Sequence, residues 1–398
     1  MEIVRNIQIK LDVREADHPV LDETFEQFRT AAQRVADHGW DDEPSRMTTT
    51  KTELHAETYA EIRDSLSLQS SLVQSARDLA ANALSNCQDR LLDGDATSKP
   101  EFDGTVVVYN GRTITYDDES VTLATTGERV TAGLVTPVEN EGTPFEDYWT
   151  DEWEKAEATL HKRDGTYYLH VAVKKAAEPA SCRDDAGNGV VLGVDLNVDG
   201  YLAVTSTGAF LGNADYLNHR RDAYEHRRRG LQQTGTRSAH LTIQSIGDRF
   251  ARWSNDYIHR VSKAVVREAV AHECTAIAFE NLEHIRDRIS AASKFQQWSF
   301  RKLKRYAEYK AEEYGIGVED VSPAYTSQRC SHTECGFVHE DNRIGDEFEC
   351  VKCGKKLHSD YNAARNIGQR LVQRWLKSGA GRATCQLALK SGVLKVNG

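Results

Sequence analysis

The sequence predicts an α/β protein in which a small β-barrel with a helical insertion precedes an α/β domain with an inserted four-cysteine module. Three observations lead to this fold class. Residues 1–12 alternate like a strand and are separated by a helical block from the strand-like residues 104–175. Three strands, then alternating helices and strands, begin at Val190. Four cysteines at metal-ligand spacing lie within residues 330–353.

The N-terminal half predicts one domain made from two separated segments. From Asp17 to about Asn86, apolar residues recur at intervals of three and four, which is typical of helices. Strand-like segments turn at Asn110-Gly111 and at Asp164-Gly165. We therefore expect a barrel from residues 1–15 and 100–180, a helical insertion at 16–99, and a polar linker near residue 185.

The C-terminal half predicts the element order of a ribonuclease H-like α/β domain. The expected strands are 190–195, 201–206, 209–212, 275–280 and 317–321, and the expected helices are 218–232, 243–272, 295–314 and 360–377. The predicted divisions are 186–325 and 358–380 for this domain, 326–357 for the cysteine module and 381–398 for a basic tail.

Charge is distributed unevenly along the 398 residues, whose formal net charge is -11. Residues 1–200 hold 19 lysines and arginines against 39 acidic residues, whereas residues 201–398 hold 31 against 22. The net positive charge of the C-terminal half is therefore suited to binding a polyanion. The 32 arginines exceed the 18 lysines, and this excess with an acidic N-terminal half is typical of a protein from a high-salt cytoplasm, while an ordinary acidic domain is the alternative.

Targeting signals are not apparent in the sequence. No run of 18 apolar residues occurs, and the N-terminus lacks the pattern of a signal peptide. We expect a cytoplasmic protein with no membrane partner. Four of the eight cysteines are scattered, which suits small buried side chains in a reducing compartment: Cys87, Cys182, Cys274 and Cys385.

The four paired cysteines predict a structural zinc site. Cys330 and Cys335 form one pair, and Cys350 and Cys353 form the second after 14 intervening residues. This is the spacing of a tetrahedral four-thiolate site in which the protein fills every position and the ion does no chemistry. Disulfides are the alternative, as is a site in which His332 replaces one thiolate.

Three carboxylates are candidate ligands for catalytic metal ions. Asp195 follows the apolar run "GVVLGV", Glu280 ends "TAIAFE", and Asp360 opens the last helix. A charge at the end of a buried apolar run is costly unless an ion or partner compensates it. In the predicted fold the three converge and suit two Mg²⁺ or Mn²⁺ ions that act on a phosphodiester. Alternatively, Asp195 is a turn residue, Glu280 a surface strand end and Asp360 an N-cap.

Two basic helices suggest contact with nucleic acid, with solvated helix faces as the alternative. The first predicted helix of the C-terminal half has five arginines in "NHRRDAYEHRRRGLQQ". A later helix adds Arg301, Lys302, Lys304 and Arg305 in "SFRKLKRYAEYK". Neither segment indicates which base sequence would be recognised.

Several sequence blocks together resemble the TnpB (OrfB) family of insertion-sequence transposon proteins, relatives of the type V CRISPR nucleases. The blocks are "GVDLNVDGYLAVTSTG", "AIAFENL", "VSPAYTSQRCSHTECG", "FECVKCGK" and "HSDYNAARNI". The resemblance is strong over residues 190–370 and weak before residue 180. Asn197 stands where the family commonly has glycine, and the first cysteine pair is unusually wide. With the composition, the resemblance suggests a halophilic archaeon as the source.

The resemblance implies an RNA-guided DNA endonuclease with a RuvC-type site, encoded by a transposable element and associated with transposition and DNA recombination. Asp195, Glu280 and Asp360 would bind Mg²⁺, and the N-terminal domain would act as a wedge and recognition region for guide RNA and target DNA. Two alternatives stay open. One is a catalytically silent, zinc-containing nucleic-acid-binding regulator, and the other is a transposase that joins strands itself.

Overall fold

The computed structural model describes residues 2–136, 143–176, 180–182, 188–281, 294–378 and 384–395. The chain divides into two compact units, Met1–Ala176 and Ala177–Gly398. The division falls at the start of the polar linker seen in the sequence. Each unit is described by itself.

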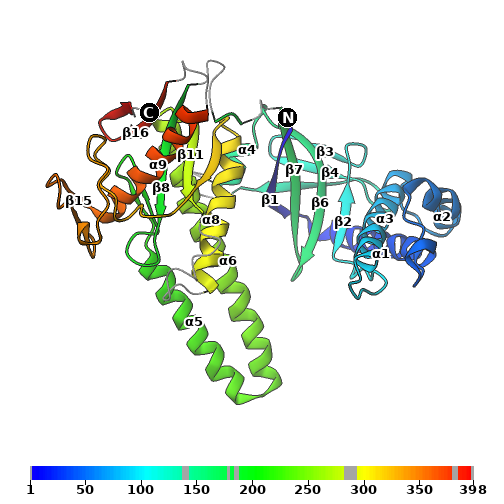
Figure 1. Cartoon of the computed structure of the whole chain (residues 1–398). Coiled ribbons are helices and arrows are strands. Elements are labelled where there is room, and N and C mark those ends of the chain that lie inside the picture. Colours follow the sequence, from blue (N-terminus) through cyan, green and yellow to red (C-terminus); the bar gives the residue numbers. More distant parts are fainter. Residues whose placement is uncertain are drawn as a thin grey trace. The chain divides into compact units, whose positions relative to one another are not determined.

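The first unit is built on an antiparallel sheet with the strand order β2-β6-β7-β1-β5-β4-β3 (Figure 1). Its strands are β1 (Glu2–Asp12), β2 (Val106–Tyr109), β3 (Ile114–Tyr116), β4 (Ser120–Leu123), β5 (Val130–Val135), β6 (Glu154–Arg163) and β7 (Thr166–Ala176). The long pair β1–β7 runs from Glu2 opposite Ala176 to Leu11 opposite Tyr167. Within the described residues the path begins at β2 and ends at β3, so hydrogen bonds between these two strands do not close the predicted barrel.

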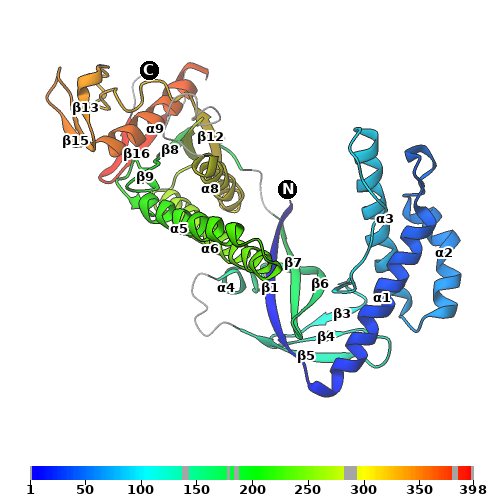
Figure 2. The ribbon, with the colours of Figure 1, turned by 90° about the horizontal axis from the view of Figure 1, so that it is seen from below.

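Helices occupy the sequence between β1 and β2, where apolar periodicity predicted a helical block. They are α1 (His18–Gly39), α2 (Lys51–Ser65) and α3 (Ser70–Leu92), with short 3-10 turns at Glu15–Asp17 and Pro44–Arg46. Figures 1 and 2 show the three helices side by side. The buried face of α1 repeats every three or four residues, at Leu21, Phe25, Phe28, Ala32 and Val35. A further short helix, α4 (Pro144–Tyr148), precedes β6.

The second unit is organised around the central strand β8. The sheet contains β8 (Gly189–Leu196), β9 (Ala203–Thr205), β10 (Phe210–Leu211), β11 (Ala276–Glu280) and β12 (Gly317–Val321), in the order β10-β9-β8-β11-β12. β8, β11 and β12 run parallel to one another. β9 pairs antiparallel with β8, and β10 pairs antiparallel with β9. The helices are α5 (Ala214–Thr234), α6 (Arg237–Ala271), α8 (Lys294–Glu312) and α9 (Ser359–Ser378).

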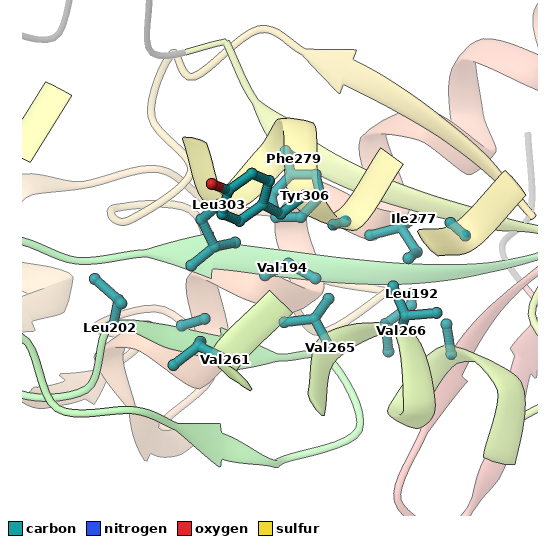
Figure 3. Packing of buried hydrophobic residues seen from close by; sticks show 14 of the residues in the cluster. Leu192, Val194, Leu202, Val261, Val265, Val266, Ile277, Phe279, Leu303 and Tyr306 are labelled. Atoms are coloured by element: carbon teal, nitrogen blue, oxygen red, sulfur yellow. The ribbon is translucent and has the colours of Figure 1, made fainter. Parts of the chain in front are cut away.

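Alternation along β8 and β11 creates two packed layers, one on each face of the sheet. Leu192 and Phe279 contribute to a core with apolar residues of α6 and α8, including Val265 and Leu303 (Figure 3). The alternate residues of the same two strands point to the opposite face, toward α9. There Val191, Ala276 and Ala278 form a second core with Ile367, Leu371 and Trp375. The sheet is thus covered on both faces, which explains the nearly continuous apolar runs of its strands.

The approach of α9 to β8 requires two glycines. A Cβ atom on Gly193 would collide with the carbonyl oxygen of Ala364 and lie 2.6 Å from the backbone nitrogen of Gly368. A Cβ atom on Gly368 would collide with Leu387 and lie 3.1 Å from the nitrogen of Gly193. Only glycine at both positions allows this backbone-to-backbone packing.

The cysteine module precedes α9 and has a small sheet of its own. The strands β13 (Arg343–Ile344), β14 (Glu347–Glu349) and β15 (Lys356–His358) are paired in this order, after a 3-10 turn at Glu340–Asn342. Phe348, Cys330 and Cys350 form its buried core.

The prediction of a basic tail at 381–398 was wrong for its described part. Residues 384–395 contain a hairpin of β16 (Cys385–Leu389) and β17 (Gly392–Lys395). β16 pairs in parallel with the first half of β8, where Cys385 lies opposite Gly189. Its side chains Cys385 and Leu387 are buried against α9, so apolar burial outweighs the basic charge that had indicated a tail.

Among the described residues, no helix has the length and apolar content needed to cross a membrane.

Replacing Gly193 by alanine tests the close contact between α9 and β8. We expect Gly193→Ala to lower the free energy of unfolding by about 1–3 kcal/mol or more, because neither backbone can yield easily. Urea unfolding followed by tryptophan fluorescence measures the change. Gly230→Ala is the matched control because a Cβ at this exposed position in α5 meets nothing within 4 Å. A loss of stability equal in both variants would contradict the packing argument.

Candidate metal centre

Three carboxylates from separate segments lie on the face of the sheet that α9 covers. Asp195 is near the end of β8, two residues after Gly193, which contacts α9 directly. Glu280 ends β11, two residues after Ala278 of the same face. Because alternate residues of a strand share a face, both carboxylates point toward α9. Asp360 stands in the first turn of that helix.

The environment of Asp195 disfavours its charged form. The side chain is buried, with 7% of the residue exposed. Burial raises the pKa of Asp195 well above its usual value, and the negative charges of Glu280 and Asp360 raise it further. Burial also raises the pKa of Asp360. A divalent cation at this site would relieve both effects.

Arg343 of the cysteine module partly compensates these charges. Its Nη2 atom lies 3.4 Å from Oδ1 of Asp360. The guanidinium opposes the rise in the pKa of Asp360 and of Asp195. The side chain is 35% exposed, so this positive charge is accessible at the rim of the site.

Glu280 is held by the first residue of the cysteine module, Thr326. The hydroxyl of Thr326 donates a hydrogen bond to Oε1 of Glu280. Thr326 is in turn fixed by Asn366 of α9, whose Nδ2 donates to the Thr326 carbonyl at 2.8 Å. The preceding residue, Tyr325, has a φ of 60°, which is uncommon for a bulky side chain and frequent near functional sites.

The four predicted cysteines form a group that could hold a metal ion. Their sulfur atoms all lie within 4.8 Å of one another. The Sγ atoms of Cys330 and Cys353 are 3.7 Å apart, as are those of Cys335 and Cys350. His332 does not belong to this group of described residues.

Two of the thiols differ in how readily they lose a proton. Burial raises the pKa of Cys330 to about 12. Burial acts in the same direction on Cys350, but backbone N–H groups of Cys353 and Lys352 prevail and lower its pKa to about 7. A metal that binds all four thiolates must therefore displace protons, and its affinity will fall in acid.

Side-chain amides of α9 fasten the module to the helix that carries Asp360. The backbone N–H of Ser331 donates to Oδ1 of Asn362 at 3.0 Å, and Nε2 of Gln369 donates to the Ser331 carbonyl at 2.8 Å. Asn362 and Asn366 both donate to the carbonyl of Arg329, at 2.8 and 2.6 Å. The cysteine module and the carboxylate site are thus mechanically coupled through α9.

Sequence reasoning selected the side chains that form both clusters but missed their supporting residues. Arg343, Thr326 and Asn366 were not identified because each is an ordinary polar residue whose partner is distant in the chain. Thr326 and Asn366 lie within the sequence blocks that carry the family resemblance, but only the fold shows what they contact. The scattered cysteines behave as expected in part, since Cys274 and Cys385 are buried whereas Cys87 and Cys182 are half-buried.

The cysteine cluster predicts one bound zinc ion per chain. We expect Cys353→Ser to lose the ion and to increase hydrogen exchange across residues 330–357, because a structural zinc site contributes directly to local folding. Elemental analysis of purified protein and hydrogen-exchange mass spectrometry measure these effects. Cys87→Ser, outside the cluster, should change neither quantity. Zinc retained at full occupancy in Cys353→Ser would contradict the four-thiolate site.

The raised pKa values predict how the stability of magnesium-free protein depends on pH. Folded Asp195 and Asp360 keep protons at pH values where the unfolded chain has lost them, so the free energy of unfolding falls as pH rises above about 4 toward the folded pKa values. Asp195→Asn removes part of this cost. The unfolding temperature of Asp195→Asn should therefore exceed that of the wild type by a larger margin at about pH 8 than at about pH 5.5. Scanning calorimetry measures the difference, and a pH-independent effect would contradict the electrostatic account.

Comparison with known proteins identifies related chains. The model of the Cas12f1-like TNB domain matches residues 300–367, which include the module and the start of α9. The CRISPR-associated endodeoxyribonuclease Cas12f1 of Sulfoacidibacillus thermotolerans is 38% identical over 193 residues, 44% of each chain. The TnpB-like protein MJ0751 of Methanocaldococcus jannaschii is 30% identical over 130 residues, 31% of this chain and 45% of the relative. The matched segments thus span less than half the length of these two relatives.

A solved structure shares the fold over a longer part of the chain. The Cas12f1 chain of a cryo-EM complex with sgRNA and target DNA aligns with a TM-score of 0.60 and 13% identity. The alignment covers 92% of this chain and 99% of that one. The comparisons confirm the resemblance drawn from the sequence: the chain is a relative of the TnpB-like proteins and of Cas12f1.

Proposed function

We propose that this chain is a transposon-encoded, RNA-guided DNA endonuclease that hydrolyses DNA phosphodiesters at a RuvC-like site formed by Asp195, Glu280 and Asp360. The observation that carries the proposal is the convergence of these carboxylates, from two strands and one helix, on the face covered by α9. Two of them are buried and have raised pKa values. Such groups are concentrated at functional sites.

The donor set fits Mg²⁺ or Mn²⁺. All three side chains offer carboxylate oxygens, which these hard cations prefer. Among the described residues, Arg343 and His358 lie beside Asp360. Two such ions would activate a water molecule and stabilise the leaving oxygen of a phosphodiester. Asp195, Glu280 and Asp360 would hold these ions as deprotonated carboxylates, so the rate of cleavage should fall in acid.

The supporting residues have separate roles in this proposal. Thr326 orients Glu280 through its hydroxyl, and Asn366 fixes Thr326 from α9. Arg343 balances the charge of Asp360 and, being partly exposed, can donate to a phosphate oxygen that enters the site. The four cysteines would hold a structural zinc ion that keeps Arg343 and the start of α9 in place.

Guide RNA and target DNA are the proposed partners. Relatives of this chain are named as endodeoxyribonucleases, and the solved Cas12f1 structure contains sgRNA and target DNA. Basic side chains of α5 and α8 lie beside aromatic rings: Arg220 is 4.4 Å from the Trp253 ring centroid, and Lys302 is 4.5 Å from that of Trp298. These cations are suited to phosphate contacts, whereas the first unit would act as a wedge and recognition region.

Removing one carboxylate tests the proposed nuclease. The full chain, purified with the RNA that it carries, should cut DNA that matches this RNA when Mg²⁺ is present. Asp195→Ala should reduce the cleavage rate at least about 1000-fold, because a metal ligand is lost, and gel analysis of labelled DNA measures it.

Asp199→Ala is the matched control, since Asp199 is an exposed carboxylate only four residues further along the chain. It should cut at close to the wild-type rate. Wild-type protein that binds matched DNA but never cuts it would favour the silent regulator instead.

A further inference from the structure

Two exposed aromatic side chains stand beside the carboxylate site. Tyr201 is 46% exposed and Phe210 is 37% exposed, although large apolar rings usually gain from burial. Their ring centroids are 4.9 Å apart in an edge-to-face arrangement. Phe210 also meets the ring of His358 edge to face at 5.0 Å. We call Tyr201, Phe210 and His358 the aromatic arm.

Strand register places the arm on the same face as the carboxylates. Asp195 of β8 lies opposite Val204 of β9, and Val204 lies opposite Phe210 of β10. Directly opposed residues of antiparallel strands project to the same face, so Phe210 and Asp195 share the face that α9 covers. Two strand spacings separate them, which is about 10 Å.

His358 connects the arm to the helical carboxylate. Its Nδ1 atom lies 3.9 Å from Oδ2 of Asp360 and 3.3 Å from the Asp360 backbone nitrogen. The arm therefore reaches continuously from solvent at Tyr201 to the side chain of Asp360. It is assembled from β10, the loop before β9 and the last residue of β15.

Two hydrogen bonds hold the backbone at the base of the arm. Gly200, with a φ of 62°, turns the chain immediately before Tyr201. The Gly200 N–H donates to Oδ2 of Asp215 at 3.2 Å, and its carbonyl accepts from the N–H of Ala214 at 2.8 Å. A fixed aromatic ring loses little conformational entropy on binding, which favours a role in recognition.

We propose that the aromatic arm stacks against unpaired bases next to the phosphate that enters the carboxylate site. This inference rests on the proposed nuclease function, since it needs a DNA strand whose phosphate reaches Asp195 and Asp360. Bases of that strand would then pass within reach of Phe210 and Tyr201. Duplex bases are stacked on each other, so the arm selects single-stranded DNA by offering a π-face that any base can use.

A cleavage assay that combines protein and DNA changes tests this stacking. Phe210→Leu keeps an apolar side chain of similar size but removes the ring. On a single-stranded DNA probe, added with matched target DNA and Mg²⁺, it should lower kcat/KM about 5- to 150-fold. An abasic nucleotide next to the cleavage site should lower the kcat/KM of the wild type by a similar factor. The two changes together should cost little more than either alone, because both remove one stacked pair.

Conservative variants separate stacking from folding. Phe210→Tyr and Tyr201→Phe retain a ring and should keep near wild-type kcat/KM. Tyr314→Leu is the matched control: Tyr314 is 57% exposed and precedes β12, whose first residue, Gly317, pairs with Ala276 at the far end of β11 from Glu280. Its kcat/KM should be unchanged. If Phe210→Leu and the abasic probe, used together, lowered kcat/KM by the product of their separate factors, the proposal would be overturned.

A second readout does not depend on cleavage. Single-stranded DNA containing 5-iododeoxyuridine would be photocrosslinked to the Asp195→Asn chain, which leaves the DNA uncut, and the crosslinks mapped by mass spectrometry. Crosslinks at Tyr201 or Phe210 support the arm even if the wild type proves inactive as a nuclease. Crosslinks confined to other residues, with an active wild type, would refute the arm while leaving the nuclease intact.

Discussion

The contact between Gly193 and Gly368 is the constraint on which the second unit depends. Both residues lack a Cβ, so α9 and β8 pack backbone against backbone. This approach sets the position of the whole helix over one face of the sheet. Asp360 in its first turn is thereby brought toward Asp195 and Glu280, which the strand alternation already places on that face.

Bringing three carboxylates together is electrostatically unfavourable, and the surrounding residues reduce this cost in different ways. Arg343 supplies a partly exposed positive charge, and Thr326 supplies a hydrogen bond to Glu280. Both residues come from the segment between β12 and α9, which the cysteine cluster and the amides of Asn362 and Asn366 hold in place. The module therefore contributes to the proposed site through the residues that it positions.

The sequence predicted the second unit well because its signals are local. The apolar runs ending at Asp195 and Glu280 and the cysteine spacing each describe one segment, and the order of segments indicated the fold. Pairings between distant segments were not predictable in the same way. The β16 strand was missed because its partner β8 is nearly 200 residues away, and Arg343 was missed because its contact with Asp360 depends on the packed module. Phe210 is an unremarkable residue until strand register places it beside the site.

Binding of Mn²⁺ to Gly368→Ala tests most directly whether the packing of α9 builds the metal site. Gly368 lies about 12 Å along the helix from Asp360 and offers no ligand. The account predicts that Gly368→Ala, at a temperature where it remains folded, binds Mn²⁺ at least about 10-fold more weakly than the wild type in an electron paramagnetic resonance titration. Gly230→Ala should bind as the wild type does. Equal affinity in folded Gly368→Ala and wild type would contradict the account.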